Sequence, residues 1–257
     1  MSNYEEIKKR KQTRIRIKRT ITSILLIIVF LLWGIYALLQ SDLFNLKVIE
    51  VLDNHQIDYD EIFQYSRLVK DRNILKYNLA EIEVNVAEHA YIKAADVTRK
   101  LPNKIIINVK ERREYAIIAY MGSYIYIDQE GVLLKVTDHG LSQELPLITG
   151  AEFQSFNVGE PVDVINLQDL YKVFRLLEAA ELSEMLETIS EVNISEADNI
   201  RLYTFDGIEV QLGTASNPAY LMLALKEVLI NLYTTNRRDV IIDLRYDGHI
   251  TVRDRNS

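Results

Sequence analysis

Residues 91–112 read YIKAADVTRKLPNKIIINVKER, and this stretch decides the fold of the region around it. Two runs, 93–100 and 104–110, flank the tripeptide Leu101-Pro102-Asn103. Proline has no backbone N–H and a fixed φ, so it suits a turn and not the middle of a sheet. The stretch therefore predicts two β-strands joined by a short turn.

The residues before this hairpin complete a small domain. Residues 44–51 (FNLKVIEV) alternate after Asn45, which is typical of a strand. Residues 59–68 and 78–88 predict two helices, the second with Leu79, Ile82 and Val86 at helical spacing. The predicted order is β-α-α-β-β, with both helices on one face of a three-stranded sheet.

Further towards the N-terminus, residues 21–39 (ITSILLIIVFLLWGIYALL) carry no charged side chain. A helix of this length spans about 28 Å, close to the thickness of the hydrocarbon layer. Residues 1–20 contain eight bases and two acids. We expect a single-pass protein that contacts the lipid bilayer through residues 21–39, with the basic tail in the cytoplasm. The alternative is a cleaved signal peptide, which usually has a shorter apolar region that ends in small residues.

Residues 113–257 predict a second domain of mixed, β-rich structure with two helices. The helices are 167–181 and 218–233, the first with Asn166 and the second with Asn217 as the expected N-cap. The predicted strands are 124–127, 132–136, 189–194, 201–205, 208–212, 240–244 and 249–253. The fold class is therefore α+β, and the predicted parts are 1–20 (tail), 21–39 (transmembrane helix), 40–112 and 113–257.

The side chains favour binding over catalysis. The chain has no cysteine and four scattered histidines, and it has no nucleotide-binding, zinc-protease or hydrolase motif. We therefore expect no catalytic residue, metal, cofactor or small-molecule substrate. After residue 39 there are 35 acids and 22 bases, which disfavours binding to nucleic acid.

The order of these parts, together with several motifs, resembles the bacterial cell-division family FtsQ/DivIB. The motifs are the hairpin 91–112, where Tyr91 stands in place of a proline, the stretch Tyr126–Leu133 with Asp128 and Gly131, and Asp243-Leu244-Arg245-Tyr246. The resemblance implies that residues 40–112 form a POTRA-like domain. It also implies a scaffold at the division septum that binds small single-span coiled-coil proteins of the FtsB/DivIC and FtsL types and helps control septal peptidoglycan synthesis. The alternative is a membrane-anchored cell-wall sensor or other binding module, which would need a ligand pocket.

The resemblance also implies two interaction surfaces. In the POTRA-like domain, the recruitment surface would include Val97, Arg99 and Pro102; alternatively Val97 is a core residue and Arg99 a solvated one. In the second domain, the last strand would bind the partner by strand addition at an open sheet edge. The predicted partner-binding residues are Arg245, Tyr246, Gly248, His249, Ile250, Val252 and Arg253. The alternatives are that Arg245 pairs with a nearby acid, that Tyr246 packs in the sheet, and that 249–253 is an interior strand.

The charge asymmetry around residues 21–39 predicts the topology. A reporter fused after Ser257 should be active only outside the cytoplasm, because the eight bases hold the N-terminal flank inside. Activity confined to the cytoplasm would contradict this orientation, and reversing several of the bases should make the orientation mixed.

Overall fold

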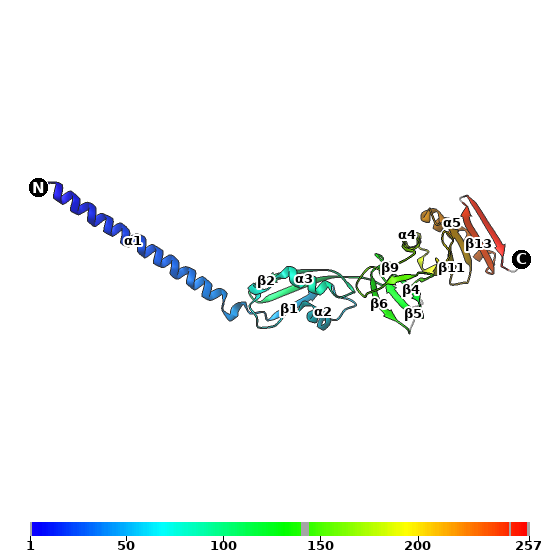
Figure 1. The fold of residues 1–257 in the computed structure, drawn as a ribbon, viewed down its shortest axis with the longest axis horizontal. Helices are drawn as coiled ribbons and strands as arrows, with labels where there is room; N and C mark the ends of the chain where they lie inside the picture. Colours follow the sequence, from blue (N-terminus) through cyan, green and yellow to red (C-terminus); the bar gives the residue numbers. More distant parts are fainter. Residues whose placement is uncertain (1, 140–143, 247, 256–257) are drawn as a thin grey trace. The chain divides into compact units, whose positions relative to one another are not determined.

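The computed structural model describes residues 2–139, 144–246 and 248–255, with side chains described from residue 17 onwards. It contains two compact units (Figure 1). The first comprises the residues up to Val86 together with Ala95–Val109, and the second comprises Ala87–Ala94 together with the residues from Lys110 onwards.

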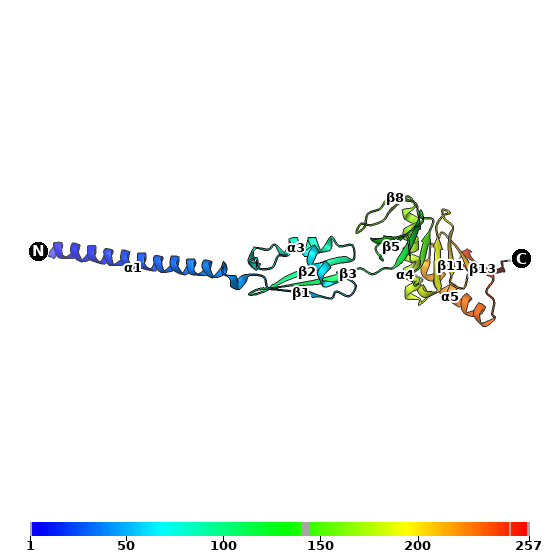
Figure 2. The same cartoon turned by 90° about the horizontal axis from the view of Figure 1, so that it is seen from below.

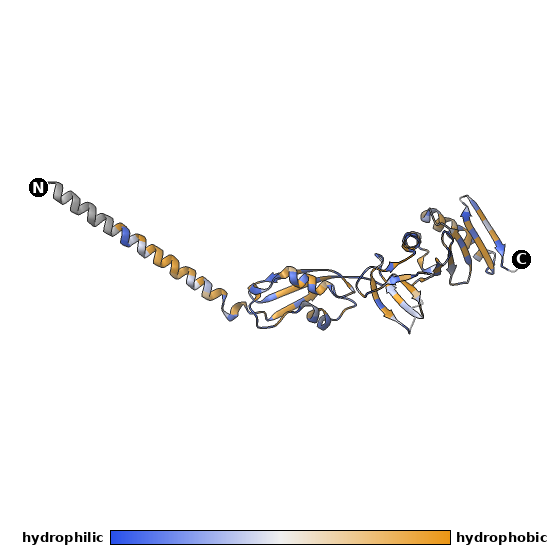
Figure 3. Cartoon of the chain, in the orientation of Figure 1, coloured by the Kyte–Doolittle hydropathy of each residue, from blue (hydrophilic) through white to orange (hydrophobic). Residues whose placement is uncertain are grey.

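Helix α1 (Ser2–Leu39) is continuous through the basic tail and the apolar segment. Its part from Ile17 to Leu39 is long and apolar enough to span a membrane, with a mean hydropathy of 2.6 over its 18-residue window, and that window is not buried against any other described residue. Figure 3 shows an apolar stretch after a short hydrophilic turn in this part of α1. This part is longer than the predicted 21–39, and at 1.5 Å per residue its 23 residues measure about 34 Å. A short 3-10 helix, η1 (Asp42–Phe44), follows.

The β-α-α-β-β order is confirmed. It consists of β1 (Val48–Leu52), α2 (Tyr59–Ser66), η2 (Ile74–Lys76), α3 (Leu79–Ala87), β2 (Ile92–Lys100) and β3 (Lys104–Glu111). The sheet order is β1-β3-β2, and β1 runs parallel to β3 with Val48 opposite Lys104 (Figures 1 and 2). Ile62, Ile82, Val97, Ile105 and Ile107 lie in the core of this domain.

The loop between α2 and α3 is fastened to the end of α1. The Asn73 side-chain amide donates to the Leu39 carbonyl at 2.7 Å, and the Asn73 carboxamide oxygen accepts from the Leu75 N–H at 2.9 Å. Leu46 exchanges two backbone bonds of 2.9 Å with the same loop, at Asp71 and Arg72. These bonds hold the loop beside the segment that leaves the membrane helix.

The second unit is built on a nine-stranded sheet of order β14-β13-β12-β11-β10-β7-β4-β5-β6. Its strands are β4 (Ala116–Tyr120), β5 (Ser123–Ile127), β6 (Leu133–Thr137), β7 (Leu147–Thr149), β10 (Ile189–Asn193), β11 (Ile200–Thr204), β12 (Glu209–Gly213), β13 (Val240–Tyr246) and β14 (His249–Asp254). A separate pair, β8 (Phe153–Ser155) and β9 (Asp163–Val164), and the short η3 (Leu186–Thr188) complete the unit. The sheet is mixed, because β4–β7, β7–β10 and β12–β13 are parallel pairs.

Two helices, α4 (Leu167–Leu182) and α5 (Pro218–Thr234), pack into the core of this sheet, as the amphipathic patterns predict. The N-cap prediction is right for α5, where the Asn217 side chain accepts from the Tyr220 N–H at 3.3 Å. Asn166 also stands at the N-cap position of α4, as predicted, but its side chain makes no cap bond. Asn166 instead donates to the Gly150 carbonyl at 2.9 Å and accepts from the Glu152 N–H at 3.2 Å, so it holds the loop after β7.

Gly150 allows that loop to pass close to the residues that follow β10. A Cβ atom at Gly150 would lie 2.4 Å from the Ser195 backbone nitrogen, and φ at Gly150 is +84°. Both the space and the backbone conformation therefore require glycine here. At Gly207, in the β11–β12 turn, φ is +82° but an added Cβ would meet nothing within 4 Å.

This contrast gives a matched pair of variants. Gly150→Ala should lower the unfolding free energy by about 3 kcal/mol or more, because it adds a backbone clash to the strain of positive φ. Gly207→Ala has only the φ strain and should cost about 1 kcal/mol. Denaturant unfolding of residues 42–257 measures both values. Equal costs for the two variants would contradict the close approach at Gly150.

Candidate partner-binding site

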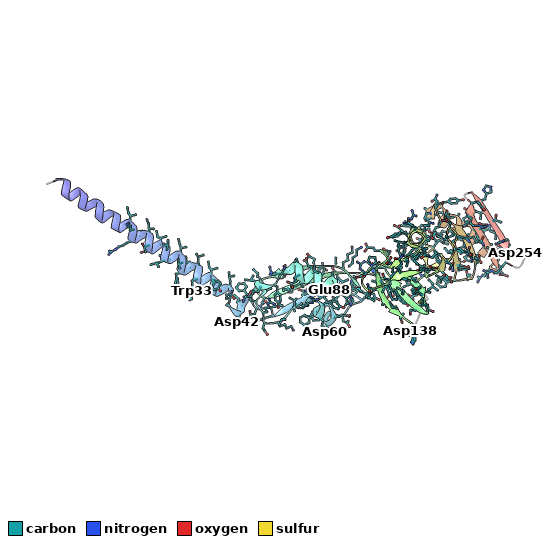
Figure 4. The ribbon with its side chains drawn as sticks, in the orientation of Figure 1. Trp33, Asp42, Asp60, Glu88, Asp138 and Asp254 are labelled. Atoms are coloured by element: carbon teal, nitrogen blue, oxygen red, sulfur yellow. The ribbon has the colours of Figure 1, made fainter. Side chains whose placement is uncertain are left out.

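The last two strands form a hairpin at one edge of the nine-stranded sheet. Among the residues that the structure describes, β14 pairs with β13 alone, in antiparallel register, with Val240 opposite Asp254 and Asp243 opposite Thr251. The segment 249–253 is therefore an edge strand, and the alternative of an interior strand is wrong. Its burial pattern fits this position, since only Val252 is partly covered. We call β13 and β14 the edge hairpin; β14 is the red strand that Figure 4 labels at Asp254.

The register of β14 indicates which of its backbone N–H and C=O groups point away from β13. The Arg255 N–H donates to the Asp239 carbonyl at 3.1 Å, so at this position the strand turns its N–H towards the segment that leads into β13. N–H directions alternate along a strand. The N–H groups of Val252 and Ile250 therefore point away from β13, towards the open edge. A row of unpaired donors and acceptors of this kind can accept a further strand.

Arg245 is held by a carboxylate on its own strand. Its Nε and Nη2 donate to the two oxygens of Asp243 at 2.9 and 2.6 Å, and its backbone N–H donates to Asp243 Oδ1 at 3.1 Å. The Arg245 hydrogen bond holds the pKa of Asp243 below its ordinary value, against the partial burial that raises it. In the unbound chain Arg245 therefore pairs with a nearby acid, as the predicted alternative has it. The Arg245 side chain is still 40% exposed.

The pairing of β13 and β14 is irregular at this point. Between Asp243 and Tyr246 the register shifts, so Leu244 and Arg245 lie opposite a single residue of β14. The stem of Arg245 lies over Gly213 of β12, where an added Cβ would come within 3.3 Å of the Arg245 Cγ. The bulge and the glycine together set the direction of the arginine.

Tyr246 ends β13 with 68% of its surface exposed, so it does not pack into the sheet. The Arg245 guanidinium carbon lies 5.8 Å from the centre of its ring, within cation–π range. Gly248 begins the return with φ +75°, which suits glycine, and its N–H donates to the Tyr220 hydroxyl at 3.1 Å. The tyrosine and the arginine are thus presented next to each other at the tip of the edge hairpin.

The other predicted residues of the last strand lie along β14. His249 and Arg253 are exposed, Ile250 is 43% exposed, and Val252 is partly buried against the core. Arg253 lies opposite Ile241 and contributes to the low pKa of Asp243. All seven predicted partner-binding residues are therefore together in the edge hairpin; whether they contact a partner stays a prediction.

The three residues predicted for recruitment are not alike. Val97 is 3% exposed and belongs to the core. Arg99 donates from Nε to the Ile74 carbonyl at 3.0 Å and from Nη2 to the Tyr77 carbonyl. These two hydrogen bonds hold the η2 loop against β2. Arg99 is nevertheless exposed, as the alternative expects, and so is Pro102 in the β2–β3 turn, so these two residues, and not Val97, can contribute to a surface.

Two of the quoted motifs meet in the second unit. Arg112 donates to Asp128 at 2.5 Å and to Glu130 at 2.9 Å, and Glu130 also accepts from Lys93 at 2.5 Å. The other Asp128 oxygen accepts the N–H groups of Glu130 and Val132 at 2.9 and 2.8 Å, which shapes the β5–β6 turn. The arginine that ends the first motif thus neutralises the buried aspartate of the second.

Sequence reasoning missed three residues that shape the site. Asp243 could have been found, because it is two positions before Arg245 and strand alternation places both on one face. Tyr220 and Gly213 carry no such signal, since they come from α5 and β12 and meet the edge hairpin only through the tertiary fold.

The fold and site define a class of protein: a single-pass membrane protein with a small β-α-α-β-β domain followed by a β-rich domain with an open sheet edge. The family model of the FtsQ-type POTRA domain matches residues 44–112, and that of the C-terminal region of cell division protein FtsQ/DivIB matches residues 116–245. The chain belongs to the FtsQ/DivIB family of cell division proteins, as its motifs predict.

Individual relatives agree with this assignment. Cell division protein DivIB of Clostridium tetani is 31% identical over 192 residues, which cover 72% of this chain and 71% of the relative. DivIB of Clostridium acetobutylicum is 30% identical over 213 residues, covering 82% and 83%. The solved structure of the major extracytoplasmic domain of DivIB from Geobacillus stearothermophilus is 16% identical, with a TM-score of 0.31 over 49% of this chain and 97% of that chain. The similarity to that structure is too low to add to the argument.

The low pKa of Asp243 can be measured. In an NMR titration of residues 42–257, the Asp243 carboxyl should titrate below the ordinary value of about 3.9. Because the pKa is lowered by folding, the contribution of this carboxylate to stability is complete above about pH 4 and is lost as the pH falls through the folded pKa. Arg245→Ala should raise the Asp243 pKa clearly, and the control Arg253→Ala should raise it less. A wild-type value near 3.9, unchanged in Arg245→Ala, would contradict the pairing.

Proposed function

We propose that this chain is a non-catalytic scaffold of the division complex. In this proposal the N-terminus is cytoplasmic, the C-terminus is extracytoplasmic, and the protein is concentrated at the septum. Outside the membrane it binds small single-span division proteins of the FtsB/DivIC and FtsL types and helps to control septal peptidoglycan synthesis. The observation that carries the proposal is the open edge of β14 beside an exposed arginine and tyrosine.

Strand addition at this edge would supply both affinity and specificity. A partner strand would pair with the outward N–H and C=O groups of Ile250 and Val252, whatever its sequence. Specificity would come from the side chains at the tip. Arg245 has donors left for a partner carboxylate beyond those used by Asp243, and Tyr246 offers a large aromatic surface. Arginine and tyrosine are among the residue types that dominate binding energy at interfaces.

The wall-sensor alternative is favoured by one observation. A hollow of about 760 Å³ lies along α4, lined by aromatic and charged side chains that include Tyr115, Tyr171, Phe174, Arg175 and Glu178. Burial, followed by the carboxylates of Glu181 and Glu178, raises the pKa of Tyr115. Binding of soluble wall fragments at this hollow, lost in Tyr171→Ala, would favour the sensor.

Titration of residues 42–257 with the extracytoplasmic segment of the FtsB/DivIC-type partner tests the scaffold. Tyr246→Ala should weaken binding by about 2 kcal/mol, or roughly 30-fold in Kd, if the tyrosine is a hot spot. Ile250→Pro should abolish strand addition, because proline cannot donate from the outward position and is tolerated on an edge strand. The control Ile250→Ala keeps the N–H and should bind much better than the proline variant. Tyr171→Ala, an exposed tyrosine on α4, should bind as the wild type does.

The site lies elsewhere if Arg245→Glu, Tyr246→Ala and Ile250→Pro stay folded and bind as tightly as the wild type.

A fluorescent protein fused to the N-terminus tests the cellular part of the proposal. Septal bands support it, and uniform membrane fluorescence contradicts it. In the same strain, Pro102→Asp tests recruitment better than a change at Arg99, whose guanidinium is bound to the chain's own carbonyl groups.

A further inference from the structure

A group of exposed side chains lies where the β-α-α-β-β domain follows helix α1. Its members are the bases Lys47, Lys70, Arg72, Lys76 and Lys100 and the apolar residues Leu43, Val69 and Leu101. We call this group the basic rim. We propose that the basic rim binds the headgroups of anionic phospholipids in the leaflet where α1 leaves the membrane.

The chain keeps the basic rim close to the bilayer surface. Six residues lie between Leu39, the end of α1, and Leu46, and even a fully extended chain over these seven Cα–Cα steps reaches only about 24 Å. The hydrogen bonds of Asn73 to Leu39 and of Leu46 to Asp71 and Arg72 bring the α2–α3 loop to that same junction. Figure 4 marks the junction between Trp33, on the outer part of α1, and Asp42. Tryptophan and tyrosine prefer the headgroup level, and Trp33 and Tyr36 lie within two turns of Leu39.

The β2–β3 turn belongs to the same end of the domain. The N–H groups of Lys47 and Val48 donate to the Asn103 carbonyl at 2.9 and 3.3 Å. These bonds place Lys100 and Leu101, at the other side of the turn, near the start of β1. The basic rim therefore combines three segments that are far apart in the sequence.

Charge is distributed unevenly in a way that suits an anionic surface. Residues 66–78 contain four bases and one acid, whereas the chain after residue 39 has 35 acids and 22 bases. Two further bases nearby are already occupied, because Lys104 pairs with Glu50 and Arg99 binds backbone carbonyls, so they are not counted in the rim. The acids within the three rim segments (40–47, 66–78 and 100–103) are Asp42 and Asp71, and Asp42 accepts a bond from the Asn45 side chain at 2.8 Å. A base near an anionic membrane strengthens binding by about fivefold.

The apolar members of the rim indicate a membrane surface as the occupant. Leu43, Val69 and Leu101 are 51%, 60% and 59% exposed. Leu43 lies in the short helix η1, whereas Val69 and Leu101 lie in a loop and a turn next to Lys70 and Lys100. Single apolar side chains among bases match the boundary between headgroups and acyl chains, where the apolar part leaves water and the ammonium group remains among phosphates.

The experiment uses the full chain in lipid vesicles. Because the chain has no cysteine, a single introduced cysteine takes a fluorophore at a chosen position. The positions are Val69→Cys and Leu101→Cys in the basic rim, with Val84→Cys on α3 as the control, since Val84 is 66% exposed and lies outside the rim. Lipids with a nitroxide on the headgroup quench the fluorophore on contact. The vesicles contain either phosphatidylcholine alone or phosphatidylcholine mixed with phosphatidylglycerol.

We expect stronger quenching at Val69→Cys and Leu101→Cys in the anionic vesicles than in the neutral ones, and little at Val84→Cys in either. Salt should reduce the difference, because the Debye length shortens. Adding Lys70→Glu and Lys76→Glu to Val69→Cys should remove most of the difference, and circular dichroism should show that the variant stays folded. Equal quenching in neutral and anionic vesicles, unchanged by the two substitutions, would mean that the tether alone keeps the rim near the membrane. That result, or quenching that appears only when another division protein is added, would overturn the proposal.

Discussion

Backbone hydrogen bonding at a sheet edge is the constraint on which the second unit depends. Among the described residues, the nine-stranded sheet has two edge strands, β14 with β13 as its neighbour and β6 with β5. At β6 the edge residue Leu133 exchanges backbone bonds with Gly159 and Glu160, whereas β14 is paired on its inner side. The crossover through α5 makes β12 and β13 parallel neighbours, and the hairpin after β13 can then extend the sheet only outwards. Because α5 packs over the core while β14 lies beyond it, the last strand has few buried side chains. The edge is therefore open as a result of the topology, and a few side chains at its tip determine what it can bind.

Much of this fold could be predicted from local patterns. The period of the apolar residues identified the helices of both domains, and the turn at Leu101-Pro102-Asn103 separated the two strands of the first hairpin. The apolar segment without charges was equally clear. The edge hairpin was found from its turn and from the motif around Arg245. These features depend on neighbours in the sequence, and that is why one sequence is enough to find them.

The contacts that fix the site could not be predicted in the same way. Nothing near Arg99 in the sequence indicates that its guanidinium closes a loop more than 20 residues earlier. Asn166 has the sequence context and the position of a helix cap, yet its side chain binds the loop at Gly150 and makes no cap bond. The strand order also requires a crossover that periodicity does not describe. In each case a partner from another element decides the outcome.

The Asp243–Arg245 pair has a consequence for the entropy of association. A free arginine side chain has about 2 kcal/mol of rotamer entropy, much of which is lost when an interface immobilises it. Here two hydrogen bonds to Asp243 already fix the guanidinium in the unbound chain, and Gly213 leaves room for its stem. Folding therefore restricts most of that motion in advance. A ligand that accepts hydrogen bonds from the remaining N–H groups of Arg245 therefore binds an arginine that is already ordered. Little further conformational entropy of this side chain is lost on binding.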